Sequence, residues 1–159
     1  MPTAWRLVRS SHTAQAFDGE GARLYPGRWN SPGVRMVYTA DSPALAALEI
    51  LVQIHGEPPD DRYMLIAATF PERTVTRLDP GELPQGWATY PAAPPLRILG
   101  DTWIARNTSL ILAVPSAVIP EQHNFLINPR HPDFPSLKIA VPRAFTFDPR
   151  LLPPRPPLP

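Results

Sequence analysis

The stretch DSPALAALEILVQI, residues 41–54, is the strongest local signal in the chain and predicts a helix over residues 43–54. Ser42 offers an N-cap oxygen, the next residue is a proline suited to the first helical position, and the Ala and Leu residues that follow favour helix. Ser42, Glu49 and Gln53 form one narrow polar stripe, because seven and eleven residues are close to whole numbers of turns. We therefore expect a helix that is buried on its other faces.

Around this helix, apolar segments bounded by Pro and Gly predict short strands. A second helix is predicted over residues 95–106, where Gly100 lowers the helix propensity. Residues 124–135 are polar and interrupted by proline, which predicts a loop. The predicted strands cover residues 5–8, 34–39, 63–70, 73–78, 109–114, 138–141 and 145–147. With Pro 24 and Gly 8 spread along the chain, we expect many short elements joined by rigid turns.

Length and composition fit one globular domain with a single core. The 159 residues include 43% hydrophobic and 18% charged residues, and the formal net charge is only +1. Such a balance predicts no direct binding to nucleic acid, which usually requires a strong positive excess. No apolar run approaches the ~20 residues of a membrane span, and no signal peptide is visible, so we expect a cytoplasmic protein without membrane contact.

Proline also marks the end of the chain, where it occupies six of the eleven positions in residues 149–159. That composition cannot form a packed core and predicts an extended or disordered tail. The predicted domain therefore covers residues 1–148.

Common catalytic templates are absent from the sequence. Cys 0 excludes thiolate nucleophiles and cysteine zinc sites, and the histidines lack metal-ligand spacing, so no metal is expected. Neither a Rossmann nor a P-loop glycine motif is present. A hydrolase triad of Ser116, His123 and Asp133 can be assembled, although a chain of this length offers such a set by chance.

Four residues occupy unusual positions. Arg28 lies in the Pro/Gly-braced segment YPGRWNSPG, Tyr38 ends a predicted strand, Glu49 sits on a largely apolar helix, and Ser116 follows a predicted core strand. Each also has an ordinary structural explanation. Arg28 could be a surface turn residue and Tyr38 an ordinary strand aromatic. Glu49 could lie on the solvent-exposed face of the helix, and Ser116 could simply form a turn. Residue patterns alone leave both interpretations open.

Several motifs together resemble the RES domain, a bacterial family named for an arginine, a glutamate and a serine. The resemblance covers residues 5–148, and the three name residues map to Arg28, Glu49 and Ser116, with Tyr38 also in place. The motifs that carry it are Trp5-Arg6, GRWN at 27–30, Tyr38, LAALE at 45–49, VPS at 114–116 and NFLINPRHPDF at 124–134.

This resemblance implies an α+β fold, a single compact domain with small sheets around a cleft, similar to ADP-ribosyltransferase toxins. It also implies the toxin of a type II toxin–antitoxin pair that depletes NAD. The expected reaction cleaves the ribose–nicotinamide bond with phosphate or water as acceptor, so NAD is a substrate, inorganic phosphate a co-substrate, and no cofactor is needed. The expected partner is an antitoxin with an Xre-like helix-turn-helix domain that covers the active site.

The chemistry of this cleavage suits the residues. Positive charge develops on the ribose in the transition state, so a carboxylate at Glu49 would stabilise it, while the forked cation of Arg28 suits phosphate groups. Tyr38 could stack on nicotinamide. We therefore predict Arg28, Glu49 and Tyr38 as catalytic residues, and the predicted substrate-binding residues are Ser116, Asn124, Trp29 and Asn30.

Two other functions remain open at this stage. The same site could transfer ADP-ribose to a protein target as a mono-ADP-ribosyltransferase. Alternatively, the chain could be a non-catalytic binding module that displays LPPRPPL, residues 152–158, as a polyproline II ligand.

Overall fold

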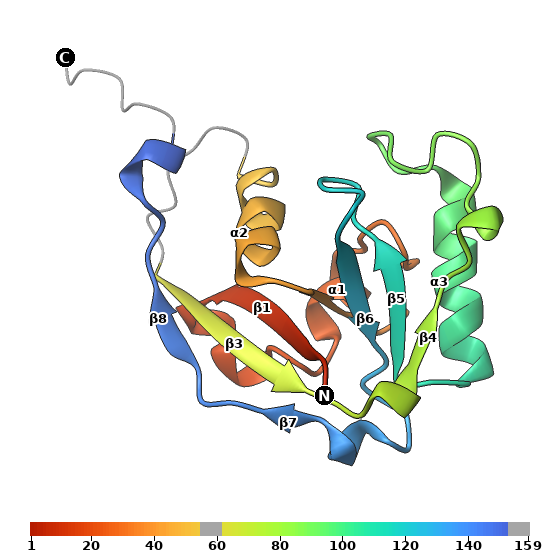
Figure 1. The fold of residues 1–159 in the computed structure, drawn as a ribbon, viewed down its shortest axis with the longest axis horizontal. Helices are drawn as coiled ribbons and strands as arrows, with labels where there is room; N and C mark the ends of the chain where they lie inside the picture. The colour runs from red at the N-terminus through yellow and green to blue at the C-terminus, as the bar shows by residue number, and fades with distance from the viewer. Residues whose placement is uncertain (55–61, 153–159) are drawn as a thin grey trace.

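Within residues 1–54 and 62–152, the part of the chain that this computed structural model describes, eight strands form one sheet. Their order is β4-β5-β6-β2-β1-β3-β7, with β8 beside β3 (Figure 1). The strands are β1 (Thr3–Arg9), β2 (Val37–Ala40), β3 (Tyr63–Thr69), β4 (Val75–Arg77), β5 (Ile111–Pro115), β6 (His123–Ile127), β7 (Lys138–Ile139) and β8 (Arg143–Phe145). The helices are α1 (Glu20–Leu24), α2 (Pro43–Leu51) and α3 (Pro94–Arg106), and no helix in the described ranges is both long and apolar enough to cross a membrane.

The sheet is nearly divided between β1 and β2. These strands share one register pair, Trp5 with Ala40, whereas β1 and β3 pair from Thr3 with Thr69 to Arg9 with Tyr63. The small sheets expected from the sequence are thus two halves of one sheet, β4-β5-β6-β2 and β1-β3-β7 with β8. Residues from both halves contribute to one shared core cluster, which includes Ala4, Ile66, Val37 and Phe125.

Each half also has a helix against it. Leu45 and Ala46 of α2 pack in a cluster with Leu7 of β1 and Leu65 of β3. On the other half, Leu96 and Trp103 of α3 pack with Leu112, Val114 and Leu126 from β5 and β6. The two helices therefore stand at opposite sides of the molecule, with the ends of β5 and β6 between them (Figure 1).

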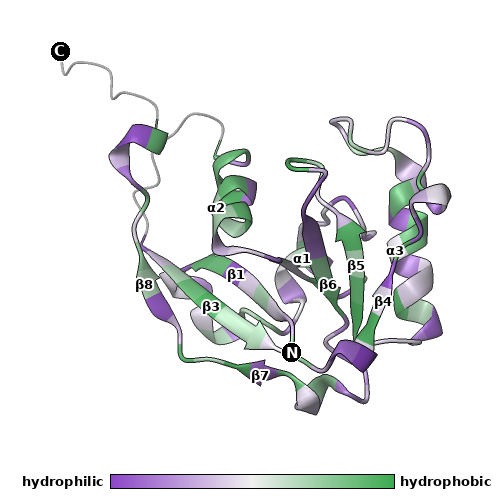
Figure 2. Cartoon of the chain, viewed as in Figure 1, coloured by the Kyte–Doolittle hydropathy of each residue, from purple (hydrophilic) through white to green (hydrophobic). Residues whose placement is uncertain are grey.

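The predicted helix after residue 42 is confirmed, with its cap. Ser42 Oγ accepts a hydrogen bond from the Leu45 amide at 3.1 Å, and Pro43 occupies the first turn. The helix is largely hydrophobic along its length (Figure 2), as expected for a segment packed against β1. It ends at Leu51, three residues earlier than predicted.

The predicted loop over residues 124–135 is wrong at its start. Residues His123–Ile127 form β6, which pairs with both β2 and β5 and lies inside the sheet. The strand begins with a hydrophilic pair and ends with three apolar residues (Figure 2), a pattern too short to indicate a strand. The predicted strand over residues 73–78 also differs, because its first part is the 3-10 turn Glu72–Thr74.

Only the beginning of the predicted tail is described. Pro149–Leu151 form a 3-10 turn, and Leu152 packs against the cluster below α2. Residues 153–159 lie outside the described part of the chain, and with them most of the predicted LPPRPPL ligand.

Gly100, which weakens the predicted second helix, is required by a close contact. A Cβ atom at this position in α3 would lie 1.8 Å from the Trp29 carbonyl oxygen. Helix α3 therefore contacts the backbone of the GRWN segment directly. This contact requires glycine at position 100, although glycine has a low helix propensity.

We expect Gly100→Ala to lower the free energy of unfolding by about 2 kcal/mol or more, because the helix and the loop must separate. Gly21→Ala in α1 is the matched control, since a Cβ there meets nothing within 4 Å, and it should be neutral or stabilising. Urea denaturation of both variants measures the difference. Equal stability of the two variants would show that the contact is not tight in solution.

Candidate active site

Glu49 and Ser116 meet where α2 faces the end of β5. Ser116 Oγ donates a hydrogen bond to Glu49 Oε1 at 2.9 Å. Ser116 Oγ also accepts hydrogen bonds from the amides of Val118 and Ile119 at 3.0 and 3.2 Å, and Ser116 is fully buried. Ser116 therefore contacts Glu49 and the following turn, and its hydroxyl is already used. Glu49 itself is only half-buried, and Ser116 Oγ holds one of its two carboxylate oxygens.

Arg28 lies in the loop between α1 and β2 and contacts a distant segment. Its Nη1 donates to the carbonyl oxygens of Trp87 and Thr89 at 3.0 and 2.8 Å. Burial lowers the pKa of Arg28, while the nearby Glu49 carboxylate and Tyr38 oppose this shift. The cation and the carboxylate that the sequence places 21 positions apart are thus electrostatic neighbours.

Tyr38 is hydrogen-bonded to two residues of the loop that carries Arg28. Its hydroxyl donates to Asn30 Oδ1 at 2.7 Å and accepts from the Trp29 amide at 2.9 Å. Burial raises the pKa of Tyr38 above its ordinary value, so the phenol stays neutral and able to donate. The ring also lies against Gly27, where a Cβ would come within 2.8 Å of it.

Asn30 and Trp29 shape this loop from inside. Asn30 is fully buried, and its amide nitrogen donates to the carbonyls of Ala22 and Val34 at 2.7 and 3.1 Å. The Trp29 side chain is only 2% exposed and packs in the cluster beneath α3. Both side chains are thus buried inside the loop, and the substrate-binding role predicted for them stays a prediction.

Asn124 is the remaining predicted residue. It lies on β6 opposite Val114 and Ala40, one step along the strand from the position opposite Pro115. Its side chain is half-buried and donates to the Thr39 carbonyl at 3.3 Å. Asn124 thus belongs to the same edge of the sheet as Ser116, and it is more accessible than that serine.

The structure does not bring together the alternative hydrolase triad. The Ser116 hydroxyl is engaged with Glu49, and His123 Nδ1 lies 3.8 Å from Asp41 Oδ2. Asp133 follows the opposite end of β6, where its amide bonds to His131. In the described residues there is also no group of three or more His, Cys, Asp or Glu side chains that could hold a metal ion.

The sequence did not indicate the groups from other segments of the chain that hydrogen-bond to the Arg28 loop. Asp101 of α3 accepts from the Ser31 amide at 2.9 Å and from its hydroxyl at 2.5 Å. The carbonyls of Trp87 and Thr89 hold Arg28 itself. Backbone carbonyls carry no residue-type signal, so only the local turn sequence around Gly86 could have pointed to them.

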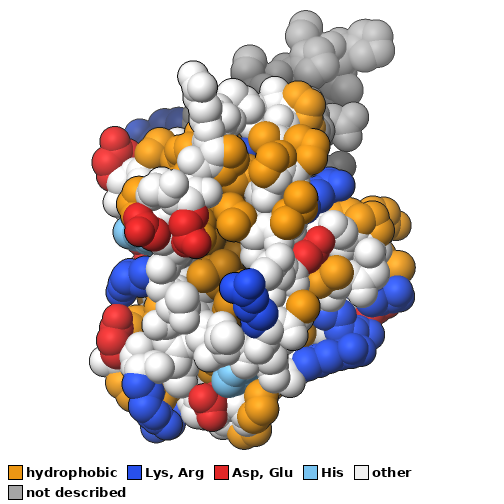
Figure 3. Space-filling view, turned by 90° about the vertical axis from the view of Figure 1, so that its right-hand side faces the viewer, with side chains coloured by type: hydrophobic (Ala, Val, Ile, Leu, Met, Phe, Trp, Pro, Cys, Tyr) orange, Lys and Arg blue, Asp and Glu red, His pale blue; other side chains and the backbone are white. Residues whose placement is uncertain are grey.

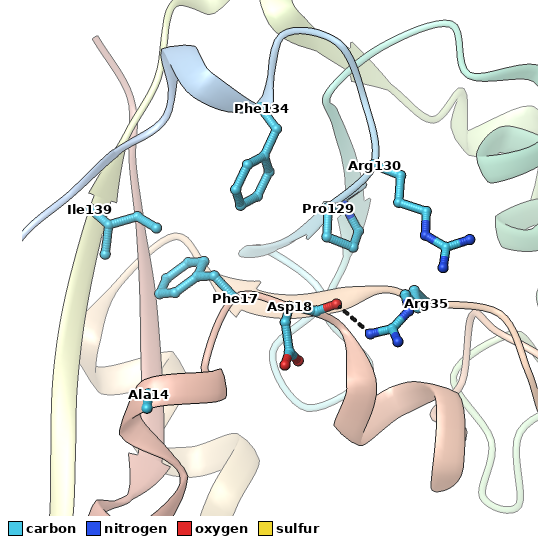
Figure 4. Close-up of a pocket in the computed structure, with 8 residues that line it drawn as sticks. All are labelled: Ala14, Phe17, Asp18, Arg35, Pro129, Arg130, Phe134 and Ile139. Carbon is cyan, nitrogen blue, oxygen red and sulfur yellow. Dashed lines mark hydrogen bonds between the residues drawn. The ribbon is translucent and has the colours of Figure 1, made fainter.

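A separate hollow lies beside the residues that follow β6 (Figure 4). Its volume is about 450 Å³, and its lining includes Phe17, Arg35, Arg130 and Phe134. Arg35 is already bound to the Asp18 carbonyl at 3.0 Å and to the Glu20 carboxylate at 2.6 Å. None of the predicted site residues lines this hollow, so it is not part of the candidate active site.

Comparison with known proteins gives consistent matches across the chain. The family model of the RES domain matches residues 3–148. A protein of Sphingobium sp. (strain YBL2) named Prs ADP-ribosylating toxin is 38% identical over 154 residues, which cover 93% of this chain and 95% of that protein. A protein of Yersinia enterocolitica (serotype O:8) named Toxin Res is 36% identical over 148 residues, 92% of this chain and 97% of that protein.

A solved structure supports the fold. A chain in the crystal structure of the M. tuberculosis MbcT–MbcA toxin–antitoxin complex superposes with a TM-score of 0.76, at 19% identity, over 91% of this chain and 84% of that chain. The predicted α+β fold class is confirmed: the chain is a mixed α and β domain with a curled sheet, and it shares the fold of that chain.

We expect Tyr38→Phe to lower the free energy of unfolding by roughly 1–3 kcal/mol, because Asn30 Oδ1 and the Trp29 amide each lose a buried partner. Tyr25→Phe is the matched control from the same loop, since Tyr25 is 82% exposed, and it should stay within about 0.5 kcal/mol of the parent. Thermal and urea unfolding test both. If the two substitutions cost the same, the hydroxyl of Tyr38 does not hold the loop.

Proposed function

The chain belongs to the RES domain family, and we propose that it is the toxin of a toxin–antitoxin pair that depletes NAD by cleaving its ribose–nicotinamide bond. The observation that carries this proposal is the Glu49 carboxylate, hydrogen-bonded by Ser116 and near enough to the Arg28 guanidinium to oppose the lowering of the Arg28 pKa by burial. The names of the relatives support a toxin, and the name of the Sphingobium relative supports chemistry that transfers ADP-ribose.

Glu49 would act on the reacting sugar. When the bond breaks, nicotinamide leaves with the bonding electrons, and positive charge develops on the ribose C1′ and ring oxygen. A carboxylate beside this carbon binds the transition state more tightly than the ground state. The hydrogen bond from Ser116 keeps one carboxylate oxygen oriented, so Ser116 is best understood as a positioning residue for Glu49.

Arg28 would bind the anions of the reaction. Its Nη1 is held by two carbonyls, and no bond from Nε or Nη2 is seen among the described residues, which leaves one edge of the guanidinium for phosphate. Phosphate bound there could attack C1′ with an oxygen lone pair to give ADP-ribose 1-phosphate and nicotinamide. Tyr38, Trp29 and Asn30 would act through the loop that carries Arg28, while Asn124 could contact ribose or phosphate.

A protein acceptor is the second candidate, favoured by the ADP-ribosylating name of the Sphingobium relative. The bond that breaks is the same, and a nucleophilic side chain of the target replaces phosphate. With water as acceptor, the same step releases ADP-ribose.

The proposed partner is an antitoxin with an Xre-like helix-turn-helix domain. The face formed by α3 and the loop before it has hydrophobic side chains gathered in its upper part (Figure 3). Tyr90 in this loop is 84% exposed and Ile98 in α3 is 65% exposed. The same loop contacts Arg28, so a protein bound there would lie next to the proposed site.

Incubation of the purified protein with NAD, with and without inorganic phosphate, tests the reaction. We expect loss of NAD, release of nicotinamide and, with phosphate present, ADP-ribose 1-phosphate, each identified by mass. Free ADP-ribose would instead indicate water as acceptor, and a mass increase on an added protein would indicate ADP-ribosyl transfer. NAD that stays intact in every arm contradicts the proposal and favours a binding module.

We expect Glu49→Gln to lower kcat by roughly a hundredfold or more with little change in NAD binding, because the carboxylate acts mainly in the transition state. Glu72→Gln is the control, since Glu72 is exposed and pairs with Arg77 on the surface. Initial rates and calorimetric NAD titration measure the two effects. A Glu49→Gln variant with normal turnover would remove Glu49 from the mechanism.

A further inference from the structure

The turn of residues 84–89, in the connection between β4 and α3, holds one side of the Arg28 guanidinium. Arg28 Nη1 lies 3.0 Å from the Trp87 carbonyl oxygen and 2.8 Å from that of Thr89. These residues are 59 and 61 positions away from Arg28 in the sequence. A third segment, separate from those that carry Glu49 and Ser116, therefore takes part in the geometry of the site.

The turn has its own internal bonds that direct these two carbonyls. The Trp87 amide donates to the Pro84 carbonyl at 3.1 Å, and the Thr89 amide donates to the Gly86 carbonyl at 3.0 Å. Thr89 Oγ1 donates to the same Gly86 carbonyl at 2.8 Å. Gly86 lies between these bonds with φ of +73°, a left-handed conformation that β-branched residues strongly disfavour.

A held Nη1 fixes the direction of the whole group, because the guanidinium is planar and rigid. Its opposite edge, formed by Nε and Nη2, is the one suited to forked binding of an anion. Arg28 is half-buried and Glu49 is close to it, so without the two carbonyls the guanidinium could turn toward the carboxylate or the solvent.

We infer that the turn of residues 84–89 is a positioning element, in which the Trp87 and Thr89 carbonyls direct the Nε–Nη2 edge of Arg28 toward a phosphate group of the substrate. Gly86 is its positioning residue, because its backbone conformation sets the direction of both carbonyls. This inference rests on the proposed function for the identity of the anion, while the positioning itself is a property of the turn.

Substitution of Gly86 tests the inference by steady-state kinetics. A Cβ at this position meets only Thr89 Cγ2, at an ordinary 3.6 Å, so substitutions act through the backbone conformation. Gly86→Val should raise the KM for NAD and for phosphate by about tenfold and change kcat by less than about threefold, as expected for lost ground-state binding. Gly86→Asn should recover most of the loss, because Asn tolerates left-handed backbone.

A double-mutant cycle with Arg28→Ala separates positioning from other effects. If the turn acts through Arg28, Gly86→Val should raise KM no further in the Arg28→Ala background. Full additivity of the two KM effects would overturn the inference, since the turn would then act on the substrate or the fold independently. Should Gly86→Val fail to fold, Thr89→Val takes its place, because it removes only the exposed hydroxyl bond to Gly86 and should raise KM by roughly threefold.

A measurement without turnover distinguishes this inference from the proposed function. In ¹⁵N–¹H spectra, the Nε–H signal of Arg28 is assigned by its loss in Arg28→Lys, and titration with inorganic phosphate should shift it. Gly86→Val should move or broaden this signal and weaken the phosphate response, and Gly86→Asn should restore both. A parent protein that leaves NAD intact but shows this pattern contradicts only the proposed function. An Arg28 signal that is indifferent to Gly86→Val overturns the inference, whatever the activity.

Discussion

The single register pair between β1 and β2 is the constraint from which the arrangement of the site follows. At this junction Arg6 donates from Nη1 to the Tyr38 carbonyl at 2.6 Å, in place of a continued strand ladder. Burial lowers the pKa of Arg6 to about 10, partly opposed by Asp18, and its Nε has no partner among the described residues. A buried cation with an unsatisfied donor lowers the stability of the folded state. Its presence indicates that the Tyr38 carbonyl requires a hydrogen-bond donor on a side chain as long as that of Arg6. Because the sheet divides at this point, β2 leads into a helix that packs over β1 and faces the end of β5.

The open groups of the site rest on a layer of buried ones. Glu49 and one edge of Arg28 remain available, whereas Ser116, Asn30 and Trp29 are buried behind them. Each open group is fixed by hydrogen bonds from a different part of the chain, as expected of a site whose dipoles are oriented before substrate arrives. Of the three residues that give the family its name, Arg28 and Glu49 are half-buried, whereas Ser116 is fully buried and hydrogen-bonded to Glu49.

The sequence predicted an element correctly where local residue preferences determine its structure. The cap at Ser42, the proline after it and the apolar faces of α2 define a helix by local rules, and the structure has it there. Strand β6 was missed because its inner position comes from pairing with two distant strands, and no local pattern of five residues shows that. The set Arg28, Tyr38, Glu49 and Ser116 came from motif order, yet burial of Ser116 and the carbonyls that hold Arg28 depend on tertiary contacts. Motif order thus pointed to candidate residues, and only the fold shows which of their side chains are exposed.

Strand β7 has a practical consequence for handling the protein. It carries Lys138, the one lysine in the sequence, exposed and paired with Thr69 at the end of β3. This edge lies at the opposite side of the molecule from α2 and the upper loops (Figure 1). Once the N-terminal amine is blocked, amine-directed esters would attach at this one side chain. A sample coupled to a surface through Lys138 would then present α2 and the upper loops to the solution in one orientation (Figure 1). A dye attached at Lys138 would lie on the far side of the molecule from those loops.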